Sequence, residues 1–301
     1  MIEQSVECQR TECETAPRVL PAELARRTGL PYTSLLPSYS GRMEELPELW
    51  RHRELFRALV WRIIAVRYRV TFIGTAWALL QPFSLMVVFT VFLGLLARMP
   101  SDGIPYPIFF YSGVLAWQLV AQAVLQGTAT VVANDHLVKR LYFPRSLLPA
   151  AAVTASLFDF LVALPGLFLL MAVYGMIPSA GIFAFPLAIL LATLLALGLA
   201  LWGAALNVFY RDISYVVPFL VQIWMFASPV IYPESLVPEK LHWLYASNPM
   251  VTIIGITRWA FAGGPTVPMF SMAVSGAVSF VILVLGYRFF RRREASFSDV
   301  I

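Results

Sequence analysis

Charged side chains are scarce in this sequence. Only 13% of its 301 residues are Asp, Glu, Lys or Arg, whereas 59% are hydrophobic. Since a soluble domain carries about 25% charged residues, the composition excludes an ordinary soluble domain of this length. Apolar runs recur along the chain, each long enough to cross about 30 Å of hydrocarbon as a helix. We therefore predict an integral membrane protein.

Cysteines and the motifs of common enzymes are also scarce. The two cysteines, Cys8 and Cys13, have no further cysteine and no nearby histidine to complete a ligand set. This pattern favours reduced thiols over a metal or redox site. The sequence contains no G-x-x-x-x-G-K-[ST] phosphate loop and no HExxH, and its three histidines are scattered. We therefore predict a chain that is not an enzyme and has no catalytic residue, metal or cofactor of its own.

The net charge of +5 does not indicate nucleic-acid binding. The basic residues flank apolar segments, which is how membrane topology is encoded and not how a phosphate backbone is recognised. The first thirty residues are acidic and lack the apolar core of a secretory signal, so we expect a cytoplasmic N-terminus. Residues 1–44 are polar and contain several prolines, which predicts a flexible extension.

Residues 45–70 have the pattern of a basic amphipathic helix. Apolar side chains recur at steps of three and four residues, and arginines such as Arg53 and Arg57 lie between them. Such a helix is suited to the cytoplasmic surface of a bilayer. The alternative is a surface helix packed on a cytoplasmic partner, and one helix can do both.

We predict a transmembrane domain over residues 71–294, followed by a short cytoplasmic tail at 295–301. The six apolar spans are expected near residues 73–96, 108–133, 147–174, 182–209, 215–231 and 269–290. Basic residues gather before the first span, between the second and third, between the fourth and fifth, and after the sixth. The positive-inside rule makes these segments and both termini cytoplasmic.

The segment between the fifth and sixth spans, residues 232–268, is long and partly apolar. Pro233, Pro238 and Pro249 divide it into pieces too short to cross the bilayer. We interpret it as re-entrant or interfacial helices at the outer face, with an ordinary surface loop as the alternative.

Uncharged polar residues lie inside the spans in helical register. Gln118, Gln122 and Gln126 recur at every fourth position of the second span, so they share one helix face. In the first span, another shared face carries Trp77, Gln81 and Ser84. An amide facing lipid would lack a partner, so the glutamine stripe should face protein or water. Two interpretations stay open: hydrogen bonding between helices, and a conduit for a neutral hydroxylated substrate such as a sugar.

Asp159 is the single acid deep inside a predicted span. An intramembrane acid suggests function by default. Because no matching intramembrane base is apparent, we favour a structural role in which Asp159 is hydrogen-bonded to neighbouring helices. The compact inner loops at 134–146 and 210–214 are charged, and the first is stiffened by a proline. They are suited to docking a soluble domain, or they carry topogenic charge alone.

Four stretches together resemble the membrane subunit of ABC-2-type polysaccharide exporters, the family that moves O-antigen, capsule or teichoic acid polymers out of bacteria. They are RYRVTFIGTAWALLQP (67–82), NDHLVKRLYFPR (134–145), NVFYRDIS (207–214) and SNPM with TRW (247–250, 257–259). The resemblance covers residues 46 to 292 and leaves the N-terminal extension unexplained.

The resemblance implies an all-α integral membrane fold with six transmembrane helices, an N-terminal amphipathic interface helix and re-entrant outer helices. It implies a homodimer that binds two copies of a separate ATPase, which supplies the ATP and Mg²⁺ site. The cargo would be a lipid-linked polysaccharide such as O-antigen, exported across the bacterial inner membrane. No nucleic acid is implied as a partner.

The resemblance also suggests roles for individual residues. The ATPase interface would comprise Arg53, Arg57, His136, Lys139, Arg140, Tyr142, Phe143, Arg145, Arg211 and Asp212. The channel lining would comprise Trp77, Gln81, Ser84, Trp117, Gln118, Gln122, Gln126 and Gln222. The outer gate would comprise Tyr232, Trp243, Tyr245, Asn248, Pro249, Arg258 and Trp259.

Two other functions stay open. An ABC-2 exporter of drugs or lipids would share the fold and the ATPase partner but carry apolar cargo. An ion-driven secondary transporter would need titratable groups at the middle of the membrane, and only Asp159 qualifies.

Overall fold

The structure is a computed structural model that describes residues 52–69, 74–140, 143–238, 240, 245 and 247–297. All of these lie in one compact unit, Leu49–Ile301. The regular elements of this described part are helices. The predicted extension at 1–44, the predicted ATPase-interface residue Tyr142 and the predicted gate residue Trp243 lie outside the described residues.

Five helical segments are long and apolar enough to cross a membrane. They are Gly74–Leu96, α6 (Tyr106–Ala133), α8 (Leu147–Val173), Ala180–Phe209 and α13 (Met269–Glu294). They coincide with five of the six predicted spans, so the chain is an integral, multi-pass helical membrane protein. The predicted fifth span is represented by a shorter apolar helix of 14 residues, α10 (Ile213–Phe226).

Two of these long segments are composite. The first joins η2 (Gly74–Ala76), α5 (Trp77–Phe89) and the π-helical η3 (Thr90–Leu96). The other begins as η4 (Ala180–Ala184) and continues as α9 (Phe185–Phe209). Pro82 lies inside α5 and has no backbone N–H to donate, so it removes one helical hydrogen bond from the first segment.

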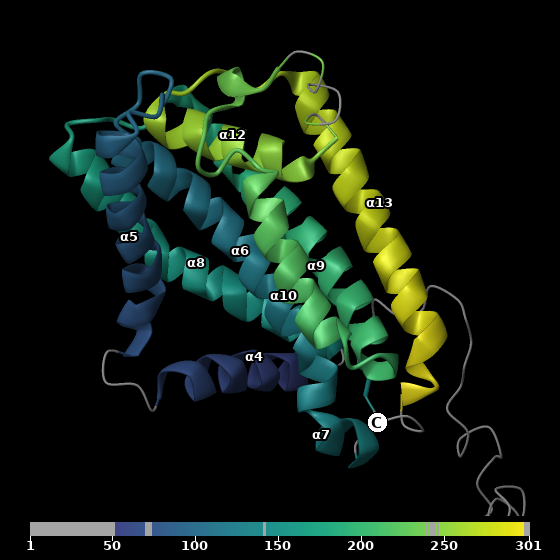
Figure 1. The fold of residues 1–301 in the computed structure, drawn as a ribbon. Helices are drawn as coiled ribbons and strands as arrows, with labels where there is room; N and C mark the ends of the chain where they lie inside the picture. The colour runs from purple at the N-terminus through teal and green to yellow at the C-terminus, as the bar shows by residue number, and fades with distance from the viewer. Residues whose placement is uncertain are drawn as a thin grey trace, which may run out of the picture. The chain divides into compact units, whose positions relative to one another are not determined.

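The centre of the fold is α6. Most of its side chains are buried, and it contacts α8 and α9 along its length (Figure 1). Helices α5, α10 and α12 (Pro249–Ala262) contact it as well. The buried Asn207 amide of α9 donates to the Thr128 carbonyl of α6 at 3.1 Å. This contact is a hydrogen bond between two of the spans.

Helices α9 and α13 touch backbone to backbone. A Cβ placed on Gly198 would lie 2.7 Å from the Leu283 backbone nitrogen. A Cβ on Gly286 would meet the Gly198 carbonyl oxygen in the same way. In lipid, where helices gain little from burying apolar surface, such close approach supplies the packing energy.

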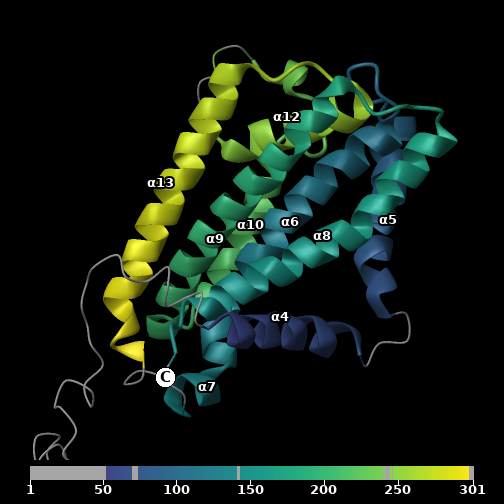
Figure 2. The ribbon, with the colours of Figure 1, turned by 180° about the vertical axis from the view of Figure 1, so that it is seen from behind.

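Different helices gather at the two ends of the described unit (Figure 1 and Figure 2). At one end, α4 (Arg53–Tyr68), α7 (Asp135–Arg140) and the last turns of α13 come together. One apolar cluster there contains Leu59, Val138, Phe143, Phe290 and Phe297. At the other end, α12 packs on α6, α9 and η4, and η5 (Glu234–Leu236) precedes α12 in the chain. Basic residues concentrate at the α4 end, which is the pattern that the positive-inside rule associates with the cytoplasmic side.

Candidate functional site

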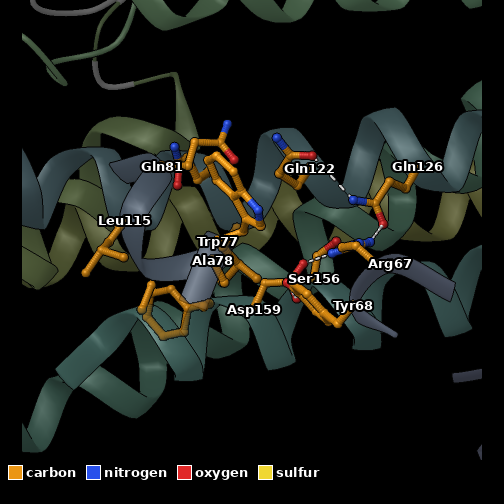
Figure 3. A pocket seen from close by; sticks show the side chains of 14 residues that line it. Arg67, Tyr68, Trp77, Ala78, Gln81, Leu115, Gln122, Gln126, Ser156 and Asp159 are labelled. Carbon is orange, nitrogen blue, oxygen red and sulfur yellow. Dashed lines mark hydrogen bonds and ion pairs between the residues drawn. The ribbon is translucent and has the colours of Figure 1, made fainter. Parts of the chain in front are cut away.

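A cavity of about 340 Å³, lined by both polar and apolar side chains, lies among α4, α5, α6 and α8. Fourteen residues line it (Figure 3). They are Arg67, Tyr68, Trp77, Ala78, Gln81, Leu115, Gln118, Leu119, Gln122, Gln126, Ser156, Asp159, Phe160 and Ala163. The cavity is therefore built by residues far apart in the sequence, at the end of the fold where α4 lies.

Helical periodicity places most of the polar lining. Gln118, Gln122 and Gln126 are each four residues apart on α6, so they form one stripe along the cavity. Trp77 and Gln81, which are also four residues apart, line the same cavity from α5. The structure thus brings together five of the eight residues predicted to line the channel.

The floor of the cavity is a network of charged and amide groups (Figure 3). Arg67, at the end of α4, forms an ion pair with Asp159 of α8. The Arg67 guanidinium also donates to the Gln126 Oε1 atom. In turn, Gln126 donates from Nε2 to the Gln122 Oε1 atom at 3.3 Å. The Tyr68 hydroxyl donates to the Asp159 Oδ1 atom at 2.6 Å.

These contacts confirm the expectation that Asp159 is hydrogen-bonded to a neighbouring helix. The base that the sequence did not reveal is Arg67. Arg67 and Tyr68 are cavity residues that sequence reasoning missed. The available signal was their position in the last turn of an amphipathic helix, directly before the first span.

Part of the lining has hydrogen-bonding capacity left over. Within the described part of the chain, no hydrogen bond engages the Gln81 or Gln118 side chain, in contrast to Gln122 and Gln126. The Trp77 ring is 47% exposed beside them. Amides bind hydroxyl groups, and a ring face accepts the apolar face of a sugar. The cavity can therefore hold a neutral hydroxylated ligand.

The other three predicted lining residues lie elsewhere. Trp117 is only 4% exposed and packs edge-on against Trp224 of α10, with ring centroids 5.3 Å apart. Adjacent helical residues are about 100° apart, so Trp117 cannot share the face of Gln118. Ser84 and Gln222 are exposed on α5 and α10 and are not among the cavity residues.

At the opposite end, Asn248 ties α12 to α10. Its Oδ1 atom accepts from the Met250 backbone N–H at 3.1 Å and so caps α12, with Pro249 as the first helical residue. The same oxygen accepts from Trp224 Nε1 at 3.2 Å. The Asn248 amide nitrogen donates to Ser228 Oγ at 3.1 Å. One predicted gate residue therefore fixes the start of a buried helix.

Two tyrosines of the predicted gate bind each other. The Tyr245 hydroxyl donates to the Tyr232 hydroxyl at 2.5 Å, and Tyr232 donates to the Phe226 carbonyl at 2.9 Å. Burial, reinforced by the hydrogen bond with Tyr232, raises the pKa of the Tyr245 hydroxyl well above its ordinary value. It therefore stays protonated and able to donate at physiological pH.

Arg258 is buried in the middle of α12, with 6% of its surface exposed. Its guanidinium lies 3.5 Å from the centre of the Phe109 ring and donates to the Val230 carbonyl at 3.0 Å. The neighbouring Trp259 packs against Gly181 of η4. Asn248, Arg258 and Trp259 thus tie α12 to α10, α6 and η4.

With this geometry in place, a family comparison identifies the chain. The family model of ABC-2 type transporters matches residues 54–262, more than two thirds of the sequence. This chain belongs to the ABC-2 type transporter family. It is therefore a transmembrane permease subunit without an ATPase domain, and its family implies a partner ATPase.

Curated relatives of this ABC-2 subunit include polysaccharide permeases. The O-antigen export system permease protein RfbA of Myxococcus xanthus is 30% identical over 257 residues, which cover 84% of this chain and 98% of the relative. An RfbA protein of Klebsiella pneumoniae is 25% identical over 79% of this chain and 91% of its own. The polysialic acid transport protein KpsM of Escherichia coli is 23% identical over 79% and 92%.

Several predicted ATPase-contact residues of the ABC-2 subunit are exposed at the α4 end. Arg53 and Arg57 lie on the exposed side of α4. His136 and Lys139 are exposed on the short helix α7, where both lie within ion-pairing distance of Asp135. Arg211 and Asp212 are exposed at the start of α10. These side chains form a charged surface open to a partner.

Phe143 and Arg145 make internal contacts instead. Phe143 is buried in the apolar cluster at the α4 end. The Arg145 backbone N–H donates to the Glu294 Oε1 atom at 2.7 Å, and its guanidinium donates to the Glu294 carbonyl. They tie the loop after α7 to the end of α13. The side chain of Arg140 lies outside the described residues.

Proposed function

We propose that this ABC-2 subunit forms the membrane passage of an ATP-driven exporter of a neutral polysaccharide. The observation that carries the proposal is the cavity, in which the free amides of Gln81 and Gln118 lie beside the exposed Trp77 ring. Sugars stack on such rings and hydrogen-bond to such amides. The kinship with O-antigen permeases supports a polysaccharide as the cargo, without indicating its charge.

The position of the cavity suits the entry of a polymer from the cytoplasm. Gln118 lies near the middle of α6, and Gln126 lies towards its cytoplasmic end. The lining therefore follows the inner half of the span, next to α4. We propose that a lipid-linked polymer such as O-antigen enters here and leaves past α12, which acts as a re-entrant outer gate.

The proposed assembly is a homodimer with two ATPase copies in the bacterial inner membrane. Each subunit then contributes six spans, with α10 as the fifth. Within the described residues, wide apolar surfaces of α5, α10 and α13 are exposed and require lipid or protein to cover them. The charged surface of α4, α7 and the start of α10 is the proposed ATPase contact, and ATP and Mg²⁺ bind to that partner.

The test replaces two of the amides with apolar side chains. Cells that depend on this chain and its ATPase for surface polymer receive the double variant Gln118→Leu, Gln122→Leu. We expect export to fall at least about tenfold, because sugar hydroxyls lose their partners in the passage. The matched control is Thr193→Val on α9, where the hydroxyl bonds only to its own helix, at 2.7 Å to the Ile189 carbonyl.

Each outcome separates one function from another. Loss of export in the amide variant with a normal Thr193→Val control supports a glycan passage. Unchanged polymer export after the loss of both amides would contradict the proposal. Export by the purified chain without any ATPase would contradict it as well. A drug or lipid exporter should tolerate the amide replacement and carry apolar cargo instead.

The ion-driven alternative loses its main support in this structure. That alternative needed a titratable acid in the middle of the membrane, and Asp159 was the only candidate. Both Asp159 oxygens are engaged, one by Arg67 and the other by Tyr68. With both oxygens engaged by neighbouring side chains, Asp159 acts as a contact between α4 and α8 in this structure.

A further inference from the structure

The cavity holds two opposite charges that cancel. Of the fourteen lining residues, Arg67 and Asp159 are the charged ones, and they form an ion pair. The rest of the lining consists of amides, rings, apolar side chains and the hydroxyls of Ser156 and Tyr68. The lining therefore carries no net charge.

The network also leaves these two charges little capacity for a ligand. The Arg67 side chain is 27% exposed and that of Asp159 is 17% exposed. One terminal nitrogen of Arg67 binds Asp159 and the other binds Gln126. The two Asp159 oxygens bind Arg67 and Tyr68. An anion entering the cavity meets a cation whose charge is already compensated.

Resting on the proposed function, we propose that Asp159 is a specificity-determining residue that makes the cavity select uncharged sugars over acidic ones. A neutral sugar needs only Trp77, Gln81 and Gln118, and no charge opposes it. A sugar carboxylate must lose water on entry, and Asp159 cancels the one cation that would compensate this cost. In a polymer, this cost recurs with each acidic residue that passes.

The experiment compares two linear oligosaccharides of equal length on the full-length chain in lipid nanodiscs. The neutral probe is maltohexaose and the acidic probe is hexagalacturonate. Their dissociation constants are measured by calorimetry, and the readout is the ratio of the two constants. The variants are Asp159→Asn, Arg67→Gln and the double variant, which give the lining net charges of +1, −1 and zero.

The charge account makes a distinct prediction for each variant. The wild type should prefer maltohexaose, and Asp159→Asn should shift the ratio about tenfold or more towards hexagalacturonate. The double variant should return the ratio to that of the wild type, since the cavity is again neutral. Asp102→Asn is the matched control, because it makes the same change in an exposed loop at the other end of the fold.

The outcomes distinguish this inference from the function on which it rests. If the ratio does not move in Asp159→Asn, or if the double variant stays as shifted as the single one, charge does not set the selectivity and the inference is overturned. If the wild type binds neither oligosaccharide, the cavity is no sugar site, and the proposed cargo fails as well.

If Asp159→Asn does not fold, Arg67→Gln should lose any affinity for hexagalacturonate and retain its affinity for maltohexaose. Equal binding of both probes by that variant would also overturn the inference.

Discussion

Arg258 shows how one charged residue is kept inside an apolar structure. Its guanidinium is covered by the Phe109 ring and bonds to the Val230 carbonyl, and no described carboxylate lies within ion-pairing distance. The contacts connect three parts of the chain: α12, α6 and the turn after α10. The residue therefore acts as a structural link, whatever part it has in gating.

We predict that Arg258→Met lowers the thermal stability of the purified chain. Methionine fills a similar volume but leaves the Val230 carbonyl without its donor, which costs about 1–3 kcal/mol. The measurement is the midpoint of thermal unfolding in detergent. Arg288→Met, an exposed arginine on α13, should leave the midpoint nearly unchanged. Equal midpoints for the two variants would show that Arg258 is not a structural link.

At the scale of whole elements, hydrophobicity predicts the spans well but not where a helix ends. Five predicted spans agree closely with the helices, because membrane burial demands long apolar segments. The fifth apolar run was predicted to continue to residue 231, yet α10 ends at Phe226. Pro229 follows within a few residues and disfavours helix before it. The length of an apolar run thus indicates how much of the chain is apolar enough for the membrane, but it does not indicate where the helix ends.

The cavity was predictable only in part. Periodicity placed Gln118, Gln122 and Gln126 on one face, and an unpaired amide cannot face lipid. The pairing of Arg67 with Asp159 joins residues 92 positions apart on helices whose packing no local pattern defines. It depends on how α4 packs on α8, which follows from the tertiary fold. The sequence therefore predicted the stripe of amides but not the ion pair between Arg67 and Asp159.

The contact between α9 and α13 gives a prediction at the scale of a helix pair. Gly198→Ala should destabilise the chain strongly, because the new Cβ would lie 2.7 Å from the Leu283 backbone nitrogen and the helices must separate. Gly276→Ala is the matched control on α13, where a Cβ meets the Leu191 side chain at an ordinary 3.7 Å. Alanine should be tolerated there, with a gain of up to about 1 kcal/mol in helix propensity.

Thermal unfolding of the two alanine variants checks this difference. A clear drop of the midpoint in Gly198→Ala alone supports close backbone packing. Equal stability of both variants would mean that α9 and α13 do not approach as closely as the structure shows.

At the scale of the whole described unit, α4 connects the proposed ATPase-docking surface to the cavity. Its 16 residues span about 24 Å. Leu59 belongs to the apolar cluster that also contains Val138 of α7. At its other end, Arg67 and Tyr68 bind Asp159 at the cavity. A force applied by an ATPase to α4 or α7 therefore has a short, continuous route to the lining.

If the ATPase docks on α7, a charge change there should weaken ATPase binding without lowering the stability of the fold. Lys139 is exposed there, and its ion pair with Asp135 at 3.6 Å is a surface contact of little energetic weight. Lys139→Glu should weaken co-purification of the ATPase about tenfold, because it reverses the charge of a side chain in the proposed docking surface. Lys240→Glu makes the same substitution on an exposed lysine outside the proposed docking surface. It should leave the complex intact, so equal binding of the ATPase by both variants would place the docking surface elsewhere on the molecule.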